Sequence, residues 1–215
     1  YRDEWLQLIG KIETSNAENY YQMATQIMMS KLDAQGGALV KQNGPEQFKV
    51  QYAENITFRE NLDEDLVLIC QFCQQQGWIV DLHEYAQDPQ SYPSLFIQPI
   101  PWQKAGIRFI IPIFIGKAFY GLFMLKCDDV EIRLNWEDRD LFFAVSKQLG
   151  NFVSLHEAND KIAESKQFDA FNRMSAFLVH DLKNVLAQLR LITVNAEKHR
   201  NNPEFVDDVF ETVES

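Results

Sequence analysis

The strongest constraint on the fold is one helical pattern that runs from Asn135 to about Arg200 and weakens only at Gly150. A helix of about 65 residues is too long for an ordinary globular domain, so the pattern predicts a coiled coil or a helical bundle. Asn135 followed by acidic residues is typical of a helix start. At the far end an Asn-Asn pair predicts a turn, and Pro203 is expected to open a second helix.

Within this helix, apolar residues recur at alternating spacings of three and four, the pattern of a left-handed coiled coil. Val179, Leu186 and Thr193 widen the apolar stripe on one flank, which favours a four-helix bundle. Because one chain would supply two of the four helices, the pattern predicts a homodimer. The predicted seam consists of Phe168, Phe171, Ser175, Leu178, Leu182, Val185, Leu189, Ile192 and Ala196.

His180 falls at the position of this repeat that points farthest from the seam, so it is not predicted to be a buried core histidine. Residues at steps of three or four share its outward face. Apolar residues on the outside of a bundle are a liability unless another protein covers them. We interpret this face as a protein docking surface with a nucleophile at its upper end; its apolar members are Phe177, Ala187, Leu191 and Val194.

The residue types at His180, Asp181 and Asn184 suit phosphoryl transfer. Imidazole is nucleophilic and neutral near pH 7, so it can accept the γ-phosphoryl group of ATP. An adjacent carboxylate can accept the ring proton and orient the ring. The asparagine, one turn on, is placed to hold a water for hydrolysis of the phosphorylated form. Short patterns also arise by chance, which leaves a surface histidine without a function as the alternative.

The residues before the long helix alternate between helix and strand patterns. Nearly continuous apolar runs at 107–115 and 118–126 predict a central hairpin buried on both faces. A second hairpin is expected from strands at 38–41 and 48–52, on either side of an Asn-Gly turn. The other expected elements are helices at 2–13, 17–32 (capped by Asn16 and stopped by Gly36 and Gly37) and 66–76 (capped by Asn61 or Asp63, ended by Gly77), a short strand at 78–80, and a long irregular loop at 82–106.

Several further residues have both a structural and a functional interpretation. Cys70 and Cys73 have metal-like spacing, but the sequence offers no second pair, so core packing is the better reading. His83 precedes the long loop and could line a pocket, whereas His156 is expected to be a solvated surface histidine and His199 a helix-end cation. Five aromatic residues could line a ligand pocket, although packing in the core or in a lid is favoured: Trp78, Tyr85, Tyr92, Phe96 and Trp102.

Composition excludes several classes of function. The net charge of −11 argues against a nucleic-acid-binding protein and against docking on an anionic membrane surface. The longest apolar run, 109–115, is about a third of the length that a membrane-spanning helix needs. Three cysteines fit a reducing cytoplasm. The chain opens without methionine and without a secretory signal, so we expect an excised cytoplasmic fragment.

The order of elements in residues 15–150 resembles a GAF domain, a sensory α/β fold built on an antiparallel sheet. The resemblance rests on that order, on Phe109-Ile-Ile-Pro-Ile followed by Tyr120-Gly-Leu-Phe, and on the closing Trp136-Glu-Asp-Arg-Asp-Leu. The expected fold class is therefore α+β: a GAF-like antiparallel sheet flanked by helices, then a long coiled-coil helix leading into a truncated dimeric helical hairpin. These features are generic, and the GAF ligand stays unknown; no cysteine lies in a clear bilin-linking context.

Residues 168–205 resemble the dimerisation and histidine-phosphotransfer region of a bacterial sensor histidine kinase. The segments Phe177-Leu-Val-His-Asp-Leu-Lys-Asn-Val-Leu-Ala-Gln-Leu and Asn195-Ala-Glu-Lys-His-Arg-Asn-Asn-Pro-Glu-Phe are similar to the histidine kinase of the PEP-CTERM/exosortase protein-sorting system, and the opening Tyr1-Arg-Asp-Glu-Trp-Leu is similar to its segment ahead of the GAF domain. The resemblance implies that His180 is the phosphoacceptor, Asp181 its acid/base partner and Asn184 the phosphatase residue.

The resemblance also implies a protein anchored in the inner membrane, an ATP- and Mg²⁺-binding domain beyond this fragment, and a response regulator whose aspartate receives the phosphoryl group. The expected divisions are a linker helix at 1–14, the GAF-like domain at 15–150, a signalling helix at 151–167 and the phosphotransfer region at 168–215. Alone, such a fragment would not be an active kinase, and its truncated second helix would leave His180 uncovered. Two alternatives remain: a non-catalytic dimerisation scaffold, and a small-molecule sensor that acts only through partner binding.

Overall fold

The computed structural model describes residues 19–57, 63–129, 132–199 and 201–214. The chain forms two compact units that meet in sequence between Ala158 and Asn159. The helix expected at 2–13 and the expected caps Asn16 and Asn61 lie outside the described residues. Among the described residues, no helix is long and apolar enough to cross a membrane.

The first unit is built on one five-stranded antiparallel sheet in the order β2-β1-β5-β4-β3. Both predicted hairpins are confirmed. The strands expected at 38–41 and 48–52 are longer than predicted. Gly36 and Gly37, expected to stop the preceding helix, begin β1 instead. The strands are β1 (Gly36–Gly44), β2 (Gln47–Glu54), β3 (Val80–Asp81), β4 (Ile107–Ile115) and β5 (Ala118–Lys126).

Strand β4 contains a proline where its pairing with β3 has ended. The short strand β3 pairs only with Phe109 and Ile110, whereas Pro112 lies further along β4 opposite Leu122 of β5. The missing N–H of the proline therefore removes no bond from the β3–β4 pair. Its carbonyl oxygen accepts a 2.6 Å hydrogen bond from the buried hydroxyl of Ser146.

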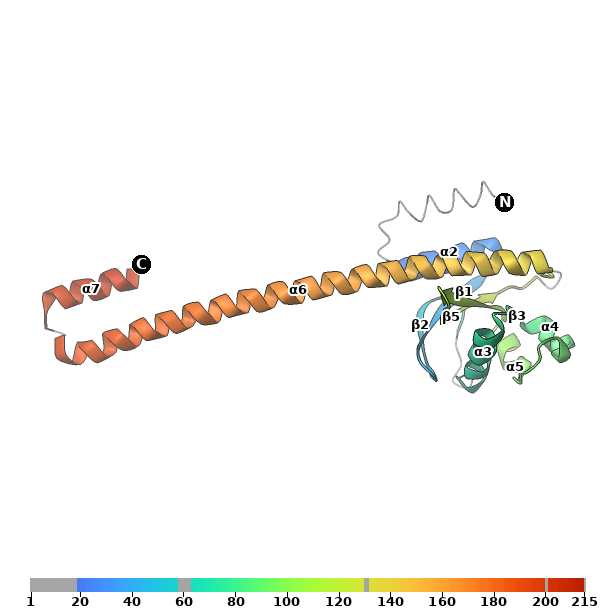
Figure 1. Ribbon diagram of the computed structural model, residues 1–215, viewed down its shortest axis with the longest axis horizontal. Helices are drawn as coiled ribbons and strands as arrows, with labels where there is room; N and C mark the ends of the chain where they lie inside the picture. Colours follow the sequence, from blue (N-terminus) through green and yellow to red (C-terminus); the bar gives the residue numbers. More distant parts are fainter. Residues whose placement is uncertain (1–18, 58–62, 130–131, 200, 215) are drawn as a thin grey trace. The chain divides into compact units, whose positions relative to one another are not determined.

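Helices cover both faces of the sheet, and each face has its own apolar core (Figure 1). Leu39 and Phe123 face α2 (Tyr20–Lys31) and the first part of α6 (Trp136–His199). Val40 and Ile110 face α3 (Asp63–Gln76), α4 (Leu82–Gln87) and α5 (Pro99–Lys104). Burying a side chain of this size contributes about 1.5–3 kcal/mol. The large apolar side chains that α6 buries are Phe142, Val145, Leu149, Phe152 and Val153.

The segment 82–106 is not the irregular loop expected from its prolines. It holds α4, a 3₁₀ turn η1 (Pro89–Ser91) and α5. The side chain of Asp81 caps α4 by accepting from the backbone N–H groups of His83 and Glu84. The hydroxyl of Tyr85 donates to the carbonyl oxygen of Leu95, which ties the segment to itself. Helices of six residues are too short to show a periodic pattern, and for this reason the sequence reads as a loop.

The aromatic residues of this region divide into two groups. Tyr85, Tyr92 and Trp102 are buried, so the core-packing interpretation is confirmed for them. Trp78 and Phe96 are instead exposed, at 43% and 80%, although the Trp78 ring lies 6.3 Å from that of the buried Tyr92. The expected strand at 78–80 is instead the two-residue β3, which shares only Val80 with it. Helix α2 begins at Tyr20, and its cap is Asn19.

The long helix α6 begins as predicted. The Asn135 side chain accepts a hydrogen bond from the backbone N–H of Asp138, and the Asp138 carboxylate accepts one from the backbone N–H of Asn135. The two residues thus form a reciprocal cap. The helix continues through Gly150, where the sheet comes so close that a Cβ would be 2.6 Å from the Ile113 side chain; a glycine therefore fits this contact. Past residue 200, α7 (Pro203–Glu214) opens at the predicted proline, with the Asn202 side chain accepting from the N–H of Glu204.

One carboxylate ties α6 to three elements of the first unit. Glu157 accepts hydrogen bonds of 2.6 Å from Tyr21 of α2, Lys41 of β1 and Tyr120 of β5. Its side chain is 12% exposed. Beside it, His156 is half-buried between the rings of Tyr20 and Phe152, so it is not the solvated histidine expected. Contacts of the first unit thus continue past residue 150, where its end was expected.

Candidate functional site

The first candidate site is the histidine on α6 and its two polar neighbours. The Nδ1 atom of His180 lies 3.3 Å from the carboxylate of Asp181 and 3.3 Å from the side-chain amide of Asn184. The imidazole is 71% exposed. Consecutive helix positions diverge by about 100°, so the Asp181 carboxylate reaches the ring from the flank, whereas Asn184 lies one turn along on the same face. Both neighbours meet the same nitrogen, and neither meets Nε2.

These two contacts require opposite tautomers of the ring. A carboxylate can only accept, so the bond to Asp181 requires the proton on Nδ1 and leaves a lone pair on Nε2. An amide N–H donating to Nδ1 requires the proton on Nε2. The Asp181 contact therefore favours the form of His180 whose Nε2 is a nucleophile, and the Asn184 contact favours the form in which it is not.

The apolar residues around this site are exposed on every side of the helix. Side chains of the docking face (Phe177, Leu191 and Val194) and of the seam (Leu182 and Leu189) are exposed to between 49% and 69%. Ala187 is exposed as well. In the single chain three seam residues, Ser175, Ile192 and Ala196, are half-buried, but the rest of the seam is as exposed as the docking face, so both assignments stay predictions. His199 is exposed at the end of α6, with its ring 6.1 Å from that of Phe205.

The second candidate site is a polar cavity in the first unit. Its volume is about 230 Å³, and its lining includes His83, Glu84 and Gln87 from α4. A second cavity of about 300 Å³ shares His83 and Arg108 with it. His83 was the single histidine considered for a pocket lining, and the structure places it in both. The remaining lining residues of the first cavity are Asp81, Arg108, Arg133, Leu134 and Arg139.

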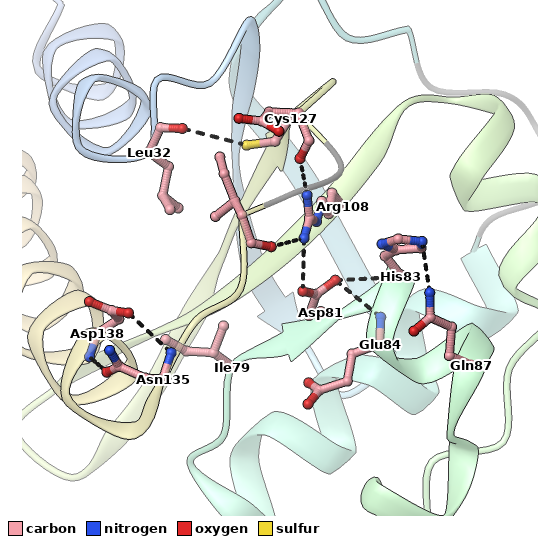
Figure 2. A network of polar contacts seen from close by, with 12 residues as sticks. Leu32, Ile79, Asp81, His83, Glu84, Gln87, Arg108, Cys127, Asn135 and Asp138 are labelled. Atoms are coloured by element: carbon pink, nitrogen blue, oxygen red, sulfur yellow. Dashed lines mark hydrogen bonds and ion pairs between the residues drawn. The ribbon is translucent and has the colours of Figure 1, made fainter.

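One wall of this cavity contains the buried side chain of Arg108 (Figure 2). The Arg108 side chain is 8% exposed and lies 3.5 Å from the Asp81 carboxylate, between it and the loop after β5. Its terminal nitrogens donate to the backbone carbonyls of Asp129 and Ile132. Its Nε is buried and has no hydrogen-bond partner among the described residues. Arg108 is thus almost completely buried, although one of its three side-chain nitrogens has no hydrogen-bond partner among the described residues.

A second arginine connects the cavity to the first turn of α6. Arg139 donates to the carbonyl oxygen of Ile79 at 3.0 Å and to Glu84 at 2.5 Å. Glu84 also accepts from the Tyr92 hydroxyl. Burial and this bond to Glu84 raise the pKa of Tyr92 above its ordinary value, so the phenol stays protonated as a donor.

The cysteines form no reactive or metal-binding site among the described residues. All three thiols are free and buried, and burial raises the pKa of Cys70 to about 12 and that of Cys127 to about 11. Their packing in the two cores agrees with the structural interpretation. No group of three or more His, Cys, Asp or Glu residues in the described part of the chain could hold a metal ion.

Sequence reasoning missed Asp81, Arg108, Arg139 and Glu157. One signal for the first was present: Asp81-Leu-His-Glu84 has the spacing of a helix-capping box. The arginines and Glu157 find their partners across 21 to 136 residues of sequence. Such pairs carry no local pattern.

No family model and no curated protein sequence matches the chain. Solved structures do match. The GAF domain of a phosphoenolpyruvate-protein phosphotransferase from Coxiella burnetii is 12% identical with a TM-score of 0.50, over 72% of this chain and 93% of that one. A far-red-absorbing protein in its dark state with bound biliverdin IXa is 15% identical with a TM-score of 0.51, over 70% and 97%. A GAF domain/HD domain protein from Geobacter sulfurreducens is 11% identical with a TM-score of 0.49, over 66% and 94%. The chain has a GAF-like fold, and at these identities the likeness concerns the fold alone.

Proposed function

We propose that this chain is the sensory and phosphoacceptor part of a two-component sensor histidine kinase, with His180 as the phosphoacceptor. The observation that carries the proposal is the 3.3 Å contact between Nδ1 of His180 and the Asp181 carboxylate, on an imidazole that is 71% exposed, because this contact favours the tautomer with a lone pair on Nε2. The GAF-like first unit supports the sensory half of the proposal. The sequence resemblance narrows it further, to the histidine kinase of the PEP-CTERM/exosortase system.

The reaction proposed for His180 is an in-line displacement at phosphorus. The Nε2 lone pair attacks the γ-phosphorus of ATP, which is held with Mg²⁺ by a separate ATP-binding domain. The bond from phosphorus to the β,γ-bridging oxygen breaks, and ADP leaves with its electron pair. As positive charge develops on the ring, Asp181 accepts the Nδ1 proton.

The second half-reaction passes the phosphoryl group to a response regulator. A carboxylate oxygen of its aspartate attacks phosphorus, the N–P bond breaks, and the ring recovers a proton. The exposed apolar residues Phe177, Ala187, Leu191 and Val194 would receive the regulator. In this proposal two chains pair through the α6 seam as a homodimer, as the heptad pattern predicts.

Phosphorylation of the chain by an added histidine-kinase ATP domain tests the phosphoacceptor role. We expect acid-labile, base-stable phosphate that His180→Gln abolishes and that His199→Gln, on the same exposed helix, leaves intact. Asp181→Asn is expected to slow labelling by about 10²–10⁴-fold through loss of the proton acceptor. Asn184→Ala should keep the label and slow dephosphorylation of the regulator. An unlabelled wild-type chain would favour a dimerisation scaffold instead, and equal labelling of His180→Gln would place the acceptor at another residue.

A further inference from the structure

The cavity between α4, β4 and the start of α6 concentrates positive charge on an acidic protein. The chain has a net charge of −11, yet three of its eight arginines line this single cavity of about 230 Å³. They face two carboxylates, those of Asp81 and Glu84. The lining groups therefore carry an excess of guanidinium over carboxylate, with the imidazole of His83 and the amide of Gln87 beside them.

The pairing of these arginines is incomplete. Arg108 is nearly buried, but its contact with Asp81 is at 3.5 Å, the outer limit for a hydrogen bond, and its Nε has no partner among the described residues. A buried, unpaired donor is costly, and a buried charge more so. Arg133 is exposed, and no hydrogen bond or ion pair holds it within the described part of the chain. Among the described residues, Arg133 is therefore the guanidinium open to an anion in the cavity, whereas Arg108 contributes a buried positive charge to the cavity wall.

The lining also limits the chemical class of such an anion. Phosphate sites are typically built from successive backbone N–H groups. Here the N–H groups of His83 and Glu84, at the start of α4, are already bonded to the Asp81 carboxylate. The donors left are side-chain guanidinium groups, whose planar fork matches a carboxylate or a phosphate. The engaged backbone N–H groups therefore favour a carboxylate, and phosphate is the comparison that tests this choice. The volume is below the range of about 300–1,000 Å³ typical of drug-sized ligands, so a large chromophore would not fit.

We propose that this cavity binds a small carboxylic acid, with Arg133 as the group that holds its carboxylate and Arg108 as a buried positive charge beside it. The ligand would lie beside Glu84 and Arg139, whose ion pair joins α4 to the first turn of α6. A bound ligand would therefore change the contacts at the start of α6, the helix that carries His180. The binding itself does not rest on the phosphoacceptor proposal, because it uses neither His180 nor ATP.

Calorimetric titration of the full 215-residue chain tests this proposal, with acetate, succinate, malate and citrate as probes and inorganic phosphate for comparison. We expect saturable binding of at least one carboxylate. Arg133→Gln is expected to weaken that binding by at least about tenfold, the value of one charge-assisted hydrogen bond. Arg190→Gln removes the same charge from an exposed position in the second unit and serves as the control. Because Arg133 is exposed, its variant should unfold at the same urea concentration as the wild type.

Three results would overturn the proposal: no carboxylate binding at millimolar concentrations, binding of phosphate alone, or an equal loss of affinity in the two arginine variants. A chain that takes up phosphate on His180 but binds no carboxylate would refute the ligand site alone. A chain that binds a carboxylate but is never phosphorylated would refute the phosphoacceptor role alone.

Discussion

Replacing Glu157 by alanine is expected to lower the free energy of unfolding of the first unit by about 2–3 kcal/mol. This carboxylate is 12% exposed, and the Lys41 ammonium that it holds is 22% exposed. Removing one partner of a fully buried ion pair costs about 3–5 kcal/mol, whereas an exposed pair contributes about 1 kcal/mol or less. The partial exposure of Lys41 places the expected loss between these limits. The hydroxyls of Tyr21 and Tyr120 lose their acceptor in the same variant.

The effect of Glu157 should depend on pH in a defined direction. Burial alone raises the pKa of this carboxyl, but the hydrogen bonds from Lys41, Tyr120 and Tyr21 outweigh burial and hold the pKa below its ordinary value of 4.5. A group whose folded-state pKa is lowered stabilises the fold above its unfolded pKa and loses that contribution as pH falls through the folded value. The stability difference between the wild type and Glu157→Gln should therefore be largest near neutral pH and shrink below about pH 4.5.

Urea unfolding followed by tryptophan fluorescence measures this loss, because the fully buried Trp102 reports on the first unit. Glu164→Ala, exposed on the same helix, is the matched control and should change stability by less than about 0.5 kcal/mol. A double-mutant cycle with Lys41→Met should give a coupling energy of about 1 kcal/mol or more. If Glu157→Ala unfolds together with the Glu164 control, the carboxylate does not hold α6 to the sheet and the reasoning fails.

Two further predictions concern association and the thiols. Leu182→Asp, at a seam position, should weaken the proposed homodimer by at least about 100-fold in a light-scattering measurement, whereas Leu191→Asp on the docking face should leave it dimeric; the reverse pattern would exchange the two faces. Cys70 and Cys127, whose pKa values burial raises to about 12 and about 11, should react with a thiol reagent at pH 8 only after unfolding, as measured by absorbance in and out of urea; rapid labelling of the folded chain would contradict their burial.

The parts of the fold that sequence predicts well are those with strong local signals. The β4–β5 hairpin combines two continuous apolar runs with a tight turn at Gly116, which adopts a positive φ of 62°. The start of α6 carries its own cap in Asn135 and Asp138. Each of these signals lies within a few residues of the structure that it forms.

The region from 82 to 106 shows where local signals fail. Its helices are held by long-range packing, such as the bond from the Trp102 indole to Asp65, rather than by their own periodicity. The candidate sites divide in the same way. The neighbours of His180 lie one and four residues away and are visible in sequence. Arg108 and Arg139 contact Asp81 and Glu84 at sequence separations of 27 and 55 residues, so only the folded chain brings these pairs together.

Pro112 also affects whether the edge of β4 beyond β3 can pair with a strand of another chain. Beyond its two paired residues, β4 continues as an apolar strand that β3 does not cover, and such an edge can template pairing with another chain. The proline withholds one of the donors that an incoming strand would need, and Ser146 already occupies its carbonyl oxygen. Pairing of another chain along this part of β4 is thereby disfavoured.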